Sequence, residues 1–327
     1  MNPPERMQCM EVWGGNQPVD SGVIMAGLDA WVYCRPFTGA DESPQGADGG
    51  GDVYYVSSCA TGRITRLLVA DVSGHGAAVG DVAGSLRTLM RKYVNYLDPS
   101  RFVGEMNQQF TALSEAGCFA TALVTTFFSP TNHLTLCNAG HPPPLIYRAA
   151  GRSWSYLREQ RPEDDSVSDL PLGIEDATDY RFFDVELKLG DFVLCYTDGL
   201  PESRGPDGEY LGLEGLLKVV QTIDISDATQ LVPRLLEAIA ALYPRNLSAD
   251  DITVLLFRPN GLAPVAPVRD RLLAPFRVLG GILKGLTPGG GPIPWPDRHP
   301  ANVGGAYFSR LNRLWAGRSR DTDSPDP

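Results

Sequence analysis

LLVADVSGHG (residues 67–76) decides the fold of this chain, because an apolar run ends in the carboxylate of Asp71 and is followed by a stretch with two glycines. The apolar residues before Asp71 are typical of a buried strand, and the residues after Val72 are typical of a turn. An aspartate in this position places a short, rigid carboxylate at the rim of a sheet, where glycine lets a ligand approach the main chain. The stretch therefore predicts that the chemistry of the protein lies at a strand end.

Further acidic residues occupy the same kind of position. They lie where predicted strands begin or end: Asp52 after the glycines 49–51, Asp198 after VLCYT, and the pair Asp250 and Asp251 before ITVLLF. Such carboxylates would repel one another if they converged, and a hard divalent cation removes that repulsion. Mg²⁺ and Mn²⁺ prefer oxygen ligands and keep several waters, so a few carboxylates suffice. Two ions could share Asp71 and acidify the water between them, which predicts metal-assisted hydrolysis.

Each of these residues also has an ordinary explanation. Aspartate at strand ends commonly caps helices and stabilises turns. A lone histidine such as His75 is more often a turn or core residue than a catalyst. Spacing alone does not decide between these interpretations.

The rest of the chain alternates short β-like runs with helical stretches. Runs rich in β-branched and aromatic residues predict strands at 53–58, 64–72, 121–128, 134–140, 182–189, 191–198 and 252–258. Helices are predicted at 77–96, 101–116, 212–222 and 227–243. Strands in clusters and helices in clusters predict an α+β fold with helices covering sheets, rather than a doubly wound sheet.

Composition is that of a folded chain, with 327 residues, 43% hydrophobic and 20% charged. No apolar run approaches the roughly 18 residues of a membrane-spanning helix. The N-terminus MNPPERMQCMEVW lacks the pattern of a secretory signal. Six cysteines are scattered singly without a CxxC pair, as expected of a reduced protein. These features together predict a cytoplasmic location.

Charge is distributed unevenly along the chain. Residues 262–327 hold nine Lys and Arg against five Asp and Glu, a net charge of +4. Since the whole chain has a net charge of −11, residues 1–261 have a net charge of −15. A body so acidic should repel nucleic acid, so nucleic-acid binding is excluded as its main task.

The order of the motifs resembles the SpoIIE-like branch of the PPM family, the metal-dependent phosphatases related to protein phosphatase 2C. The matching stretches cover about residues 28–258: GGD at 50–52, LLVADVSGHG at 67–76, CNAGHPPPLIY at 137–147, LPLGI at 170–174, LGDFVLCYTDGLPESR at 189–204 and ADDITVLLF at 249–257. One such motif alone would be weak evidence. All six in the family's order are specific.

The resemblance implies a sandwich of two antiparallel sheets flanked by helices, with two Mn²⁺ or Mg²⁺ ions at one sheet edge. It implies these metal ligands: Asp52, a bridging Asp71, the backbone carbonyl of Val72, Asp198 and Asp250, with Asp251 as the alternative to Asp250. For His75 it leaves open a general-acid role or turn stabilisation. His141, followed by three prolines, is expected to shape its loop.

The function implied by the resemblance is hydrolysis of phosphoserine or phosphothreonine on a partner protein. In related bacterial partner-switching systems such a partner is an anti-sigma-factor antagonist. Two alternatives remain: a non-catalytic scaffold of the same fold, and a phosphatase of a small phosphorylated metabolite.

The predicted domain boundaries are a short N-terminal appendage at 1–20, the phosphatase domain at 21–258, and a Pro/Gly-rich basic extension at 259–327. Within the extension, one helical face is apolar: Leu272, Phe276, Leu279, Leu283 and Leu286. A second stretch, 307–315, repeats the pattern. Three interpretations compete: a helix docked on the domain, a membrane-surface or partner-binding element through 269–286, and disorder.

Overall fold

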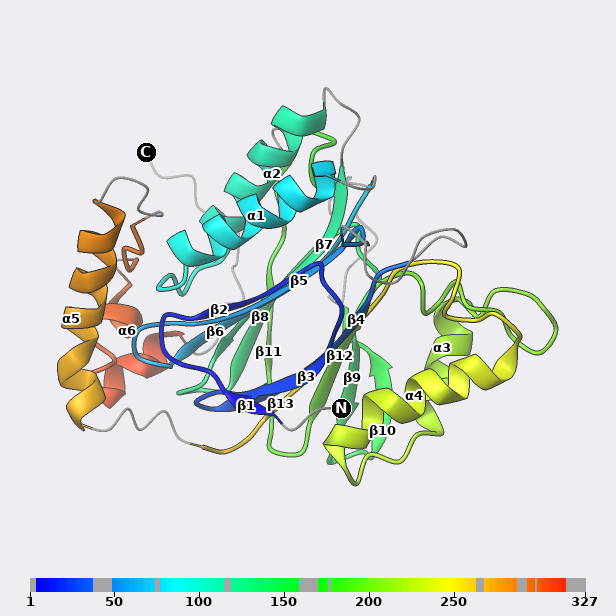
Figure 1. The fold of residues 1–327 in the computed structure, drawn as a ribbon. Helices are drawn as coiled ribbons and strands as arrows, with labels where there is room; N and C mark the ends of the chain where they lie inside the picture. Colours follow the sequence, from blue (N-terminus) through cyan, green and yellow to red (C-terminus); the bar gives the residue numbers. More distant parts are fainter. Residues whose placement is uncertain are drawn as a thin grey trace, which may run out of the picture.

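Two β-sheets form the centre of the molecule, shown in Figure 1 as a computed structural model. The structure describes residues 4–37, 49–73, 77–114, 119–158, 170–175, 178–262, 268–286, 293–297 and 299–315. The seven-stranded sheet has the order β1 (Glu5–Arg6), β3 (Val19–Ile24), β4 (Leu28–Arg35), β13 (Ile252–Pro259), β12 (Phe192–Tyr196), β9 (Leu145–Arg148) and β10 (Ser153–Tyr156). The six-stranded sheet has the order β11 (Phe183–Glu186), β8 (His133–Ala139), β7 (Ala120–Phe128), β6 (Ile64–Val72), β5 (Asp52–Ser58) and β2 (Val12–Gly15).

The two sheets pack face to face, because successive side chains of a strand point to opposite sides. Tyr54 and Val56 of β5 lie in the core between the sheets, with Val32 of β4 and Leu255 of β13. Strands such as β6 are buried on both faces and so appear in the sequence as nearly continuous apolar runs. The predicted α+β sandwich is confirmed. Its strand pairs are antiparallel except for β1 with β3, which is parallel.

Helices cover the outer faces of the sandwich (Figure 1). Helices α1 (Ala77–Lys92) and α2 (Ser100–Ser114) form one core with the six-stranded sheet, and α3 (Gly212–Gln221) and α4 (Ala228–Leu242) form another with the seven-stranded sheet. These helices lie within one to four residues of the predicted ranges. The outer faces of both sheets are thereby removed from water, which is the main source of stability.

Residues 4–20, predicted as part of an appendage at 1–20, belong instead to the two sheets. They supply β1, β2 and the first residues of β3, and Trp13 of β2 pairs with Val56 of β5. The sequence did not indicate these strands because they are short and contain Gly14 and Gly15, which are poor strand formers.

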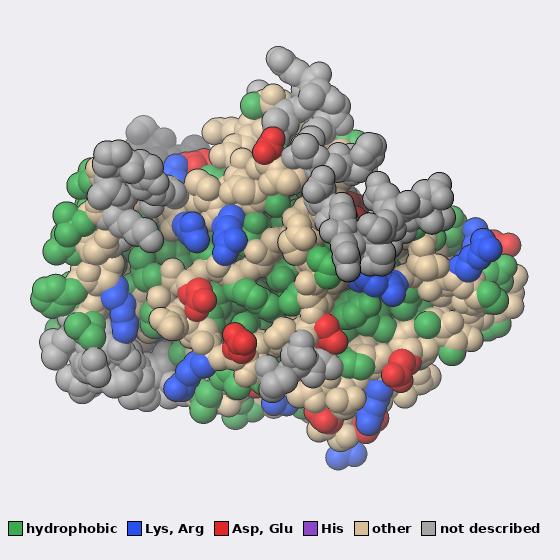
Figure 2. Space-filling view, viewed as in Figure 1, with side chains coloured by type: hydrophobic (Ala, Val, Ile, Leu, Met, Phe, Trp, Pro, Cys, Tyr) green, Lys and Arg blue, Asp and Glu red, His purple; other side chains and the backbone are tan. Residues whose placement is uncertain are grey.

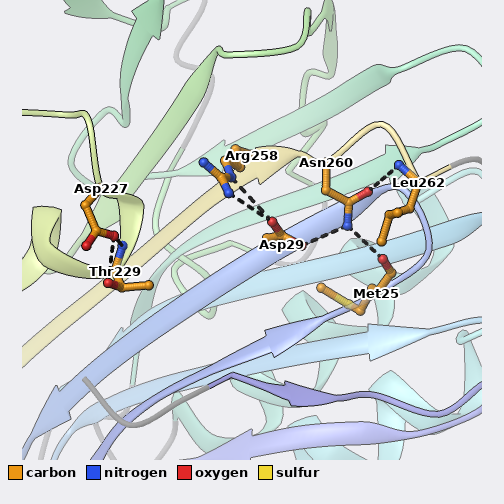
Figure 3. A network of polar contacts seen from close by, with 7 residues as sticks. All are labelled: Met25, Asp29, Asp227, Thr229, Arg258, Asn260 and Leu262. Carbon is orange, nitrogen blue, oxygen red and sulfur yellow. Dashed lines mark hydrogen bonds and ion pairs between the residues drawn. The ribbon is translucent and has the colours of Figure 1, made fainter.

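A polar network fixes the point where the chain leaves β13 (Figure 3). The Asp29 carboxylate accepts a hydrogen bond from Asn260 at 2.8 Å and lies 3.4 Å from the Arg258 guanidinium. Asn260 also donates to the Met25 carbonyl at 3.0 Å and accepts from the Leu262 amide at 2.9 Å. The start of the extension is therefore anchored to the body.

The described part of the extension contains α5 (Val268–Gly285), α6 (Pro300–Val303) and the 3₁₀ helix η1 (Ser309–Trp315). It packs against the turn between β5 and β6, where the buried Arg63 donates to the Ala301 carbonyl at 2.7 Å and to Asn312 at 2.9 Å. Asn95 donates to the Pro294 carbonyl at 2.8 Å. No helix among the described residues is both long and apolar enough to cross a membrane.

Candidate metal centre

The register of β5 and β6 brings two of the predicted ligands face to face. Asp52 and Asp71 are paired residues at the open end of this hairpin. Asp52 is only 2% exposed, and Asp71 is half-buried. A Cβ added at Gly51 would lie 2.9 Å from the Val72 carbonyl oxygen and 3.5 Å from Asp71 Oδ1. The Val72 carbonyl and the Asp71 carboxylate therefore border one small space that glycine leaves open.

The other sheet contributes its acidic residues from β12 and β13, which are adjacent and antiparallel. Asp198 follows the end of β12, and Asp250 precedes the start of β13. Asp198 is half-buried, and Asp250 is exposed. Each of the two sheets thus delivers carboxylates to the same end of the sandwich.

These carboxylates lie close enough to perturb one another. Burial raises the pKa of Asp52 well above its usual range. The pKa of Asp71 is raised to about 7, chiefly by burial, and that of Asp198 to about 6 for the same reason. The carboxylates that add to the shift of Asp71 are Asp198, Asp250, Asp251 and Glu202. Burial together with like charge is the electrostatic condition that a bound cation relieves.

Asp251 has a different environment from its neighbour Asp250. Its carboxylate accepts hydrogen bonds from the amides of Phe37, Gly51 and, at 3.3 Å, Asp52. A Cβ at Gly50 would lie 2.5 Å from both carboxylate oxygens of Asp251, so only glycine fits there. Asp251 therefore holds the glycine loop in front of β5.

A threonine that the sequence analysis did not single out joins the two sheets at this site. Thr197 Oγ1 donates to Asp52 Oδ2 at 2.7 Å and accepts from the Thr253 amide at 3.0 Å. Thr197 is fully buried. Its place directly before the predicted ligand Asp198 was the available signal in the sequence.

Comparison with known proteins agrees with this arrangement. The family described as "Stage II sporulation protein E (SpoIIE)" matches residues 61–260, which is more than half of the chain. This chain belongs to the SpoIIE family. Asp71, Asp198, Asp250 and Asp251 lie inside the matched residues, whereas Asp52 lies before them.

Individual relatives of this SpoIIE-family chain are distant. It is 25% identical over 199 residues to the phosphoserine phosphatase RsbU of Bacillus subtilis (strain 168), covering 59% of this chain and 55% of RsbU. The chain therefore matches about half the length of RsbU. The RsbU and RsbW domains of Rv1364c from Mycobacterium tuberculosis have a similar structure, with a TM-score of 0.55 and 22% identity over 81% of this chain and 75% of that one. RsbX in complex with magnesium gives a TM-score of 0.52 and 14% identity over 74% of this chain and 100% of RsbX.

The structure describes only one of the two histidines considered for the SpoIIE-family site. His75 lies outside the described residues. His141 is buried, and its Nε2 donates to the Tyr196 carbonyl at 3.1 Å while Nδ1 lies 2.9 Å from Thr121 Oγ1. Burial lowers the pKa of His141 to about 4. His141 is thus a neutral residue that ties its loop to β7 and β12, as its prolines led us to expect.

A pocket of about 420 Å³ is lined in part by Asp250. Its wall includes Glu202, two arginines and two tyrosines: Arg204, Arg245, Tyr210 and Tyr243. A larger pocket of about 450 Å³ opens beside His141, but none of the five aspartates lines it. Of these two pockets, the one beside Asp250 is lined by one of the predicted ligands, and no sequence motif had indicated it.

The donors of the SpoIIE-family site fit a hard divalent cation in kind. They are carboxylates and one carbonyl, which are the ligands that Mg²⁺ and Mn²⁺ prefer. The glycines at 50 and 51 leave room beside them that a Cβ would fill. As they stand, no three His, Cys, Asp or Glu side chains within the described ranges converge tightly enough to hold an ion. Burial first, and the neighbouring carboxylates second, raise the pKa of Asp71 and of Asp198, and a bound cation would offset both effects.

Proposed function

We propose that this chain is a divalent-metal-dependent phosphatase that hydrolyses phosphoserine or phosphothreonine on a partner protein. The observation that carries the proposal is the meeting of β5, β6, β12 and β13 at one end of the sandwich, with an aspartate at each strand end. Burying a carboxylate costs free energy, so packing alone does not explain why Asp52 is buried opposite the half-buried Asp71.

The proposed ligands divide between the two sheets. Asp52, Asp71 and the Val72 carbonyl would hold one Mn²⁺ or Mg²⁺ ion, and Asp71 would be shared with a second ion held by Asp198 and Asp250. When bound, these ions would supply Lewis-acid activation of water and neutralise charge on the phosphoryl group. We assign Asp250 rather than Asp251 because the Asp251 carboxylate is occupied by the backbone amides of Gly51 and Phe37.

The chain's own residues position these donors. The hydroxyl of Thr197 donates to Asp52 and fixes one of its oxygens, which leaves the other to face Asp71 across the hairpin. Asp251 holds the loop that carries Gly51, so that the backbone can approach the site closely. His75, four residues after Asp71 in the sequence, is proposed as a general acid for the leaving serine or threonine oxygen.

The substrate class is proposed from the relatives. RsbU is a phosphoserine phosphatase, and the RsbX structure is a magnesium complex. The Rv1364c structure joins an RsbU domain to an RsbW domain in one chain. These relatives support a phosphorylated protein as substrate, and we propose an anti-sigma-factor antagonist as the partner. The arginines and tyrosines of the pocket beside Asp250 would then contact the residues that flank the phosphorylated side chain.

Hydrolysis of p-nitrophenyl phosphate, with and without Mn²⁺, tests the proposal. We expect turnover that requires Mn²⁺ and that falls by at least about 100-fold in Asp71→Asn. Asp179→Asn, at an exposed aspartate, is the matched control and should leave turnover unchanged. Absence of metal-dependent turnover, with Mn²⁺ binding detected by calorimetry, would instead support a non-catalytic scaffold.

The nature of the substrate is tested separately. In a strain that lacks the gene, a phosphoserine or phosphothreonine peptide of one protein should accumulate, and the purified chain should dephosphorylate that protein. Turnover of small phosphorylated metabolites at rates equal to those for the phosphoprotein would contradict the proposed substrate class.

A further inference from the structure

Exposed apolar side chains are concentrated on the C-terminal extension. Of the sixteen exposed large hydrophobic side chains in the described part of the chain, nine lie in residues 268–315. Four of them form the α5 stripe, which we define as Phe276, Leu279, Leu283 and Leu286, with exposed fractions of 66%, 50%, 57% and 69%. Figure 2 shows hydrophobic side chains along the left edge of the molecule, where α5 lies in Figure 1. The apolar face predicted from the sequence thus faces away from the domain.

The domain contacts a different part of this helix. Arg277 of α5 donates to the Ala60 carbonyl at 3.3 Å, and Val278 and Ile282 are partly buried. A surface helix normally buries its apolar stripe. A second apolar face left in water on a helix that is already packed indicates a partner outside the fold.

The chain itself offers nothing to cover the stripe. The segments outside the described residues contain few large apolar side chains: 1–3, 38–48, 74–76, 115–118, 159–169, 176–177, 263–267, 287–292, 298 and 316–327. Residues 316–327, AGRSRDTDSPDP, have none. These segments therefore favour a partner from outside the sequence described here.

Charge decides which partner fits. By sequence α5 carries three arginines and one lysine against one aspartate: Arg269, Arg271, Arg277, Lys284 and Asp270. Arg310 and Arg313 of η1 are exposed beside the apolar Phe308 and Leu314. A second copy of the chain would bring two such basic helices together, and their charges would repel. An anionic surface that also accepts apolar side chains satisfies both features.

We propose that α5 lies on the surface of an anionic lipid bilayer, with the α5 stripe inserted among the headgroups. Ten residues separate Phe276 from Leu286, so the stripe runs for about 15 Å along the helix and suits a helix lying in the membrane plane.

The predicted metal ligands Asp52 and Asp71 lie far from the extension. The extension packs at the β5–β6 turn, whereas Asp52 and Asp71 lie at the other end of that hairpin. Six residues of β5 separate Asp52 from Ser58, a span of about 20 Å, which exceeds the Debye length of about 8 Å at physiological salt. Membrane-bound α5 would therefore leave the aspartate end of the sandwich open to a partner protein.

Co-sedimentation of the full chain with lipid vesicles tests the proposal. We expect binding to vesicles of phosphatidylglycerol mixed with phosphatidylcholine, much weaker binding to phosphatidylcholine alone, and release as NaCl rises from about 0.05 M to about 0.5 M. The double substitution L279S/L283S should weaken vesicle binding by at least about 10-fold, because two inserted leucines are lost. Lys284→Glu should weaken binding to the anionic vesicles several-fold.

Leu189→Ser is the matched control, since Leu189 is 63% exposed but lies on the body. It should bind vesicles as the unmodified chain does, and all variants should keep the melting temperature of the unmodified chain. The proposal is overturned if the full chain binds neither vesicle, or if L279S/L283S binds as tightly as Leu189→Ser. It is also overturned if the unmodified chain is a dimer without affinity for vesicles and L279S/L283S is a monomer.

Discussion

Replacing Asp71 by asparagine should stabilise the metal-free protein while abolishing its activity. The pKa of Asp71 is raised from 3.8 in the unfolded chain to about 7 in the folded protein. The folded protein therefore binds the proton more tightly than the unfolded chain. The resulting stabilisation is full below pH 3.8 and is lost as pH rises through 7. Since a tenfold change in proton affinity corresponds to about 1.4 kcal/mol, ionised Asp71 costs the fold about 4 kcal/mol at pH 8.

Asparagine keeps the shape of the side chain and removes the charge, but it must still be desolvated. We therefore expect Asp71→Asn to gain about 2–4 kcal/mol in the free energy of unfolding at pH 8, or roughly 5–15 °C in melting temperature. At pH 5 the gain should fall to less than half, because Asp71 is then protonated in the folded protein. Added Mn²⁺ should reverse the order at pH 8, since only the unmodified site binds the ion fully.

The measurement is thermal and urea denaturation of both proteins after treatment with a chelator, at pH 8 and pH 5, and again with Mn²⁺. Comparing the two proteins at one pH cancels the titration of His141, which is common to both. Asp179→Asn serves as the control at an exposed aspartate and should not differ from the unmodified chain. The reasoning is refuted if metal-free Asp71→Asn is less stable than the unmodified chain at pH 8, or if its advantage does not shrink at pH 5.

Four further substitutions test other parts of the structure. Asp250→Asn should lower Mn²⁺-dependent turnover by about 100-fold without loss of stability. Asp251→Ala should lower the free energy of unfolding by about 1–3 kcal/mol in urea denaturation, because the Gly51 amide loses its acceptor. Arg63→Ala should destabilise the packing of the extension by about 2–4 kcal/mol, seen as faster limited proteolysis there with p-nitrophenyl phosphate turnover retained. Burial lowers the pKa of His141, so the unmodified chain should lose free energy of unfolding as pH falls from 6.5 towards 4. His141→Gln removes this titration. At pH 5 the variant should therefore have lost about 2 kcal/mol less than the unmodified chain.

The strands that the sequence predicted and those that it missed differ in burial. Strands β6 and β13 lie inside the sandwich, so their apolar runs stand out from their surroundings. Strands β3 and β4 were missed because polar residues interrupt them, as Asp29 does at the start of β4. Strands β9 and β10 have four residues each, too few to establish a period.

The sequence singled out the acidic residues that meet at this end of the sandwich, but it did not predict how their surroundings differ. Asp250 and Asp251 are adjacent in the chain, and next to a strand successive side chains point to opposite sides. One therefore faces the pocket and the other faces the glycine loop, a distinction that depends on where β5 lies in space. Periodicity likewise identified the apolar face of α5 correctly, but it does not tell which side of a helix the domain covers.

The hydrogen bond from Gly51 to Asp251 joins residues 200 positions apart in the chain. During synthesis the loop that carries Gly51 emerges from the ribosome long before β13 does, and until then it lacks the carboxylate that holds it. Because contacts so distant in sequence form late in folding, the site is assembled only when nearly the whole domain has been made. A chain released by the ribosome before residue 251 would carry Asp52 and Asp71 but lack the carboxylate that holds the loop beside them.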